Sequence, residues 1–76
     1  MSENMGVFGD YKYRLIYYGS NVVIKGLYEI KSYDESIVIL NCGKDCVTVK
    51  GNNIVIKSMD VDNIQINGKI SDILFS

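Results

Sequence analysis

The sequence predicts an all-β protein, an antiparallel meander of about six or seven short strands that form a small sandwich or flattened barrel. β-branched residues are abundant, whereas Pro and Trp are absent, and this composition suits a pleated, half-buried surface. A V-x-V-x-G step occurs at residues 22–26 and 47–51, and in an Ile form at 64–68. Turn-forming residues interrupt any helical period throughout the chain.

The first elements follow from alternation of apolar and polar residues. Residues 1–9 show no sustained period, and we expect a flexible N-terminal arm followed by one domain over residues 10–76. Residues 11–18 alternate as a strand that places Tyr11, Tyr13, Leu15 and Tyr17 on one face. After a turn at 19–21, we expect a second strand over 22–30 that bends at its internal glycine.

The middle of the chain predicts a buried strand and a hairpin. Residues 37–40 are apolar at every position, so both faces of this strand should be covered, one of them by a sandwich partner or a second subunit. A turn follows at 42–45. Residues 46–58 predict strand, tight turn and strand, with the turn at 51–53.

The C-terminal stretch, residues 63–75, predicts a last hairpin around Asn67 and Gly68. Ile70 and Ile73 are three residues apart, which breaks the alternation and predicts a bulge near Ser71 and Asp72. A β-solenoid would need a fixed period, whereas the repeated steps lie at unequal intervals. A meander is therefore favoured over a solenoid.

Charge and length indicate which partners and which location to expect. Eight basic residues face nine acidic ones, for a net charge of −1, which disfavours nucleic acid as a partner. The sequence has no long apolar run and no signal-peptide pattern at its start, so we expect no membrane insertion and a cytoplasmic protein. A domain of 76 residues buries little surface, and we expect a homo-oligomer.

Candidate reactive groups give little support for chemistry. The chain has no His and no nucleophile motif, so we predict no catalytic residue and no enzyme. Asp60, Asp62 and Asn63 resemble the start of a calcium loop without its later Gly and Glu, so we predict no metal and no cofactor. Cys42 and Cys46 could act as a disulfide or a thiol switch, or they could simply be two small apolar side chains that pack beside a turn. The packing role is favoured.

The residues predicted to contact another subunit are aromatic and β-branched. Aromatic side chains are enriched at protein interfaces, and the candidates are Tyr11, Tyr13, Tyr17, Ile37 and Ile39. The alternative is a small ligand- or peptide-binding module with a Tyr-lined cleft. A closed pocket within one protomer would favour that alternative over a flat Tyr-bearing face.

An ordered set of segments carries a family resemblance. The segments are residues 22–26 (VVIKG), 30–34 (IKSYD), 37–40 (IVIL), 47–56 (VTVKGNNIVI), 59–62 (MDVD) and 66–75 (INGKISDILF). From residue 15 to 75 the chain resembles the YabP/YqfC family of small sporulation proteins. It departs from the family pattern at Cys42 and Asp45.

The resemblance implies a role without a known reaction. It implies a cytoplasmic protein of a sporulating Gram-positive cell that acts during spore development, and it provides no catalytic residue to carry over. It also implies that a partner, if not a second copy, is another sporulation protein.

Overall fold

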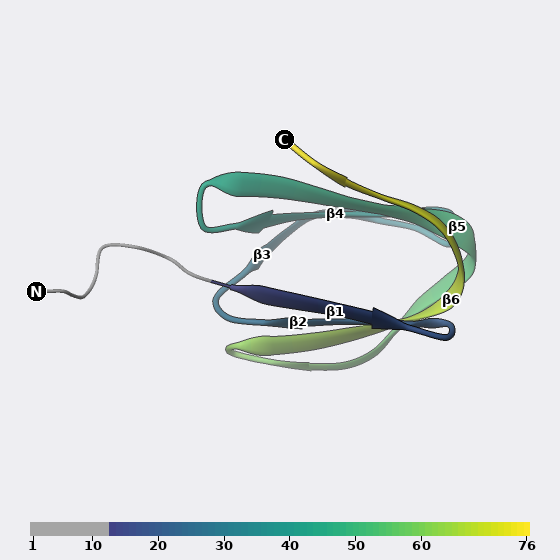
Figure 1. The fold of residues 1–76 in the computed structure, drawn as a ribbon, viewed down its shortest axis with the longest axis horizontal. Coiled ribbons are helices and arrows are strands. Elements are labelled where there is room, and N and C mark those ends of the chain that lie inside the picture. The colour runs from purple at the N-terminus through teal and green to yellow at the C-terminus, as the bar shows by residue number, and fades with distance from the viewer. Residues whose placement is uncertain (1–12) are drawn as a thin grey trace, which may run out of the picture.

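The computed structural model describes residues 13–76 as six β-strands in one antiparallel sheet (Figure 1). The strands are β1 Arg14–Tyr18, β2 Asn21–Lys25, β3 Glu29–Tyr33, β4 Ile37–Cys42, β5 Asp45–Asp60 and β6 Asn63–Phe75. The prediction of an all-β antiparallel fold is confirmed. The arm predicted over residues 1–9 lies outside the described residues. Within residues 13–76, no helix is long and apolar enough to cross a membrane.

The strand order is β1-β2-β6-β5-β4-β3. Strands β3 to β6 run as a meander, and the β1–β2 hairpin joins them through β2, which pairs with residues 63–67 of β6. The sheet folds over into two layers because the long strands β5 and β6 pass through both of them (Figure 1). One layer holds β1 and β2, and the other holds β3 and β4.

The bend in β5 and β6 replaces two predicted tight turns. Residues 51–53 lie inside β5 and residues 67–68 inside β6, so the predictions of hairpin turns there are wrong. The pairing of the two strands shifts between Asn52 and Val55, where β5 contains an extra residue. The turn-forming residues bend and bulge a continuous pair of strands at this point.

Two glycines make this bend possible because neighbouring backbone fills the space of a side chain. A methyl group at Gly51 would collide with the carbonyl oxygen of Lys69. A methyl group at Gly68, whose φ is 149°, would lie 2.9 Å from the carbonyl oxygen of Asn53. Two of the three repeated glycines, Gly51 and Gly68, thus mark close backbone approach inside strands.

The bulge predicted near Ser71 is confirmed. Lys50 pairs with Asp72 and Gly51 pairs with Ile70, so Ser71 is the extra residue of β6. Its hydroxyl donates a hydrogen bond to the carbonyl of Lys50 at 3.2 Å. The bulge lets Ile70 and Ile73, three residues apart, both pack against the core.

The strand predicted over residues 22–30 is wrong, since it is divided between β2 and β3. β2 ends at Lys25, opposite Asn63, the first residue of its partner strand β6. The amide of Gly26 then donates to the carbonyl of Asp62 at 2.8 Å. With no further β6 residue to pair with, the chain leaves this layer and enters β3 in the other one.

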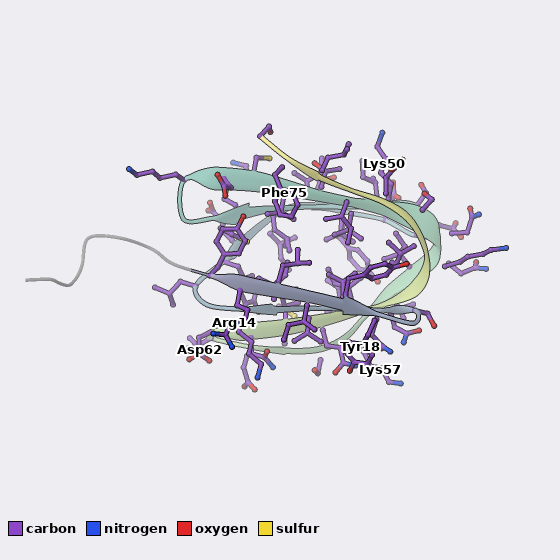
Figure 2. The ribbon with its side chains drawn as sticks, in the orientation of Figure 1. Arg14, Tyr18, Lys50, Lys57, Asp62 and Phe75 are labelled. Atoms are coloured by element: carbon purple, nitrogen blue, oxygen red, sulfur yellow. The ribbon has the colours of Figure 1, made fainter. Side chains whose placement is uncertain are left out.

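The core lies between the two layers and is entirely apolar. Ten side chains are buried: Val22, Ile24, Val38, Leu40, Cys42, Val47, Val49, Ile54, Ile64 and Ile66. Their alternation along each strand puts the intervening residues on the outer faces. Ile37 and Ile39 are half-buried on the outer face of β4, and Figure 2 shows Lys50, the β5 partner of Ile37, pointing away from the core.

Candidate interaction site

Folding one sheet into two layers leaves two lines along which strand edges face each other without ladder pairing, and no Cα atoms of the facing strands come within 8 Å of each other. We call these the β3 seam, between β3 and residues 56–60 of β5, and the β1 seam, between β1 and residues 69–75 of β6. Along β5, only residues 45–50 pair with β4, and along β6, only residues 63–67 pair with β2. The two seams differ in how side chains join them.

Two tyrosines bridge the β3 seam. The hydroxyl of Tyr28 donates to the carbonyl of Asp60 at 2.7 Å, and burial together with the charge of Asp60 raises the pKa of Tyr28. The hydroxyl of Tyr33 accepts the amide hydrogen of Ile56 at 3.4 Å. Backbone groups of β5 that β4 does not reach are therefore satisfied by tyrosine side chains beside and within β3.

The loop between β3 and β4 continues this bridge to the bend of β5. Asp34 Oδ1 accepts hydrogen bonds from the amide of Ser36 at 2.8 Å, its hydroxyl at 3.0 Å and the amide of Ile37 at 3.1 Å. These bonds to the ionised form lower the pKa of Asp34. The ordered loop then offers the Glu35 and Ser36 carbonyls to the Ile54 and Gly51 amides, at 2.8 and 3.0 Å respectively.

Among the described residues, the β1 seam is joined only near its ends. At one end the hydroxyl of Tyr13 donates to Asp45 Oδ2 at 2.6 Å. Burial, this hydrogen bond and the charge of Asp45 raise the pKa of Tyr13 to about 12. At the other end the amide of Gly68 donates to the carbonyl of Ser20 at 3.0 Å.

A groove of about 250 Å³ lies along the middle of the β1 seam. Tyr17 of β1 forms one side, and residues 70–73 of β6, including the bulge, form the other. Asp72 is the one charged residue among the lining groups. A groove beside a strand edge has a shape that can hold an extended segment.

Strand β1 also exposes large apolar side chains, with Ile16 and Tyr18 on its outer face and Tyr17 beside the groove. Exposed fractions are 37% for Ile16, 52% for Tyr17 and 53% for Tyr18. Within residues 13–76, β1 is the last strand of the sheet and pairs on one side only. Consecutive exposed apolar side chains on a terminal strand are characteristic of a surface that contacts another chain.

The structure does not gather the predicted interface residues into one patch, and the interface itself stays a prediction. Tyr11 lies outside the described residues. Tyr13 is partly buried against the core, and Tyr17 lines the groove. Ile37 and Ile39 lie in the other layer, on the outer face of β4. Sequence reasoning missed Ile16 and Tyr18, although the strand pattern itself placed them on the second face of β1.

The two cysteines are free and lie on opposite faces of the sheet. Cys42 pairs with Asp45 and is buried in the core, whereas Cys46 pairs with Asn41 and is half-buried on the outer face. Burial, with the nearby Asp45 and Cys46, raises the pKa of the Cys42 thiol. Among residues 13–76, no three His, Cys, Asp or Glu side chains are grouped so that they could hold a metal ion.

Comparison with known proteins gives one match. The model of the YabP family matches residues 16–76, which include all of the groove-lining residues. No curated protein and no solved structure matches the chain.

Proposed function

Because the chain belongs to the YabP family, which is associated with sporulation, we propose that it is a non-enzymatic interaction protein that self-associates during spore development. The YabP family is not a known enzyme family. We place the protein in the cytoplasm of the sporulating cell, where a second copy or another sporulation protein would be its partner.

The observation that carries this proposal is the open, apolar β1 edge. Three consecutive residues of β1, Ile16 to Tyr18, are exposed although each has a large apolar side chain. Contact with a second chain would remove this surface from water and add ladder hydrogen bonds. A chain of 76 residues gains stability in this way, because a domain of this size buries little surface alone.

The proposal of a non-enzymatic role rests on the groups that line the groove. They comprise a phenol, a hydroxyl, a carboxylate and two isoleucines. The chain contains no His that could act as a base at neutral pH. These groups favour contact with an extended chain over bond-making chemistry.

Sedimentation velocity on the full chain tests self-association. Between about 1 µM and 1 mM, a range that covers weak dimers, we expect the average mass to rise with concentration. A monomer throughout this range contradicts the proposal. In a spore-forming host, removal of the protein should lower the yield of heat-resistant spores, and an unchanged yield contradicts the sporulation role.

The groove favours a second candidate function, a peptide-binding module. The groove lies in one protomer and Tyr17 lines it, beside the free edge of β6. Apolar extended peptides added at concentrations where the protein is monomeric would shift the amide resonances of residues 70–73. Unshifted resonances at millimolar peptide exclude this candidate.

A further inference from the structure

We infer that two copies join edge to edge through β1, antiparallel and with Ile16 at the two-fold axis, so that the sheets of the two copies become continuous. This inference rests on the self-association proposed above and names the surface and register that produce it. The first step is that β1 differs from β3, the other terminal strand of the sheet.

β3 has the features that block pairing with another chain. It contains Glu29 and Lys31, and its pairing with β4 shifts between Ile30 and Ser32. Charges and bulges on a terminal strand prevent edge-to-edge contact. β1 pairs with β2 in unbroken register and contains neither Lys nor Pro, and Arg14 at its start is its one charge.

The sequence of β1 is complementary to itself in one register. With Ile16 opposite Ile16 of the second copy, all five residues of each strand are paired. Arg14 then lies opposite Tyr18 of the other copy, and Leu15 opposite Tyr17. The last two pairs each occur twice because the contact is symmetric, whereas the Ile16 pair on the axis occurs once.

These pairs are favourable and separate like charges. A guanidinium over a tyrosine ring is attractive, and apolar cross-strand pairs stabilise a sheet. Figure 2 shows Arg14 and Tyr18 at opposite ends of β1, so the two arginines of a pair of copies lie far apart. Registers centred on Leu15 or Tyr17 leave part of each strand unpaired, and one centred on Arg14 puts the two guanidiniums together.

The same register keeps each face of the sheet continuous. Residues that lie opposite each other are both even-numbered or both odd-numbered, so outer-face residues meet outer-face residues. Ile16 and Tyr18 contact the outer face of the second copy, and Leu15 and Tyr17 meet on the side of the core. A second copy therefore satisfies both the backbone edge and the side chains of β1.

The first experiment adds one charge to either terminal strand of the full chain. Ile16→Lys puts two ammonium groups face to face at the axis, and we expect the dimer dissociation constant to rise roughly tenfold or more. Ser32→Lys, on the outer face of β3, is the matched control and should leave the constant unchanged. Circular dichroism of both variants verifies that the sheet is retained.

A second pair of variants tests the register and does not depend on Ile16. Tyr18→Glu puts a carboxylate opposite Arg14 of the other copy, and we expect a severalfold smaller dissociation constant at low salt. Tyr18→Arg puts two guanidiniums together there, and we expect a severalfold larger one. Salt should reduce both differences, because these charges are exposed.

The outcomes separate this inference from the proposed function. A wild-type chain that stays monomeric overturns self-association altogether. A wild-type dimer weakened equally by Ile16→Lys and Ser32→Lys, or by neither, leaves self-association intact and overturns the β1 edge. Concentration-independent protection from hydrogen exchange of the β1 amides that point away from β2 also overturns it, because another part of the same chain would then cover this edge of β1.

Discussion

The two terminal strands of the sheet, β1 and β3, have the same length and opposite surroundings. Each contains five residues. β3 carries two charges and a bulge, and tyrosines beside and within it reach β5 across the seam. β1 carries one charge, has unbroken register and is joined across its seam only near its ends. The difference teaches that, within residues 13–76, one end of the sheet has features that block pairing and the other end lacks them.

The contrast arises from where polar side chains fall in the sequence. The loop after β3 contains Asp34, which orders its own backbone and so supplies carbonyls to β5. The turn after β1 supplies one carbonyl, that of Ser20. The middle of the β1 seam is left as a groove for the same reason.

The largest effect on stability is expected from a substitution at the bend that creates both seams. Gly51→Ala puts a methyl group against the carbonyl of Lys69, and neither backbone can move without breaking the β5–β6 ladder. We expect a loss of about 3 kcal/mol in the free energy of unfolding. Urea unfolding followed by circular dichroism measures this loss.

Gly19→Ala is the control for that substitution. Gly19 has φ +56° but no atom within 4 Å of an added methyl group. Only backbone strain applies, and we expect a loss of about 1 kcal/mol. Equal losses at the two positions would show that crowding at the bend does not determine its stability.

Tyr13→Phe should lower the free energy of unfolding by an intermediate amount, because it removes a hydrogen bond at one end of the β1 seam. The lost hydrogen bond to Asp45 should cost about 1 kcal/mol at neutral pH. Because the pKa of Tyr13 is raised to about 12 from its ordinary 10.0, its contribution is complete below pH 10 and is lost as pH rises through about 12. Chemical unfolding of wild type and Tyr13→Phe across this pH range should converge, and a constant difference contradicts this role.

Asp34→Ala should have the smallest effect on stability. It should act through the loop that follows β3. Without the carboxylate the loop loses three hydrogen bonds, and we expect a lower melting temperature and faster exchange of the Ile54 amide. Asp34→Asn keeps an acceptor oxygen and should resemble wild type at pH 7. Since the pKa of Asp34 is lowered, its contribution is present above its ordinary pKa and is lost as pH falls through the lowered value. A wild-type melting temperature that changes with acid no more than that of Asp34→Asn would exclude this contribution.

Alternation allowed most of the fold to be predicted. The apolar residues of 22–24, 37–40 and 47–49 alternate or run together as strands do, and all three stretches are strands. The bulge at Ser71 was predictable because Ile70 and Ile73 are three residues apart, whereas residues on one face of a regular strand are an even number apart. Local pattern is sufficient where each strand has one buried face.

The bend was not predictable from the same kind of signal. Gly51, Asn52 and Asn53 favour a hairpin turn and also favour a bulge within a strand, because both use positive φ at Gly or Asn. The choice depends on pairing with residues 67–70, which a local pattern does not contain. The groove escaped prediction for the same reason, since Tyr17 and residues 70–73 are distant in sequence.

The pairing of β2 with residues 63–67 has a consequence for synthesis on the ribosome. Strand β2 is made early, yet one of its two neighbours is the last strand of the chain. One side of the β1–β2 hairpin therefore stays unpaired until residues 63–67 have emerged. Formation of the sheet is then limited by a contact between the two ends of the described chain, and such long-range closure is slow.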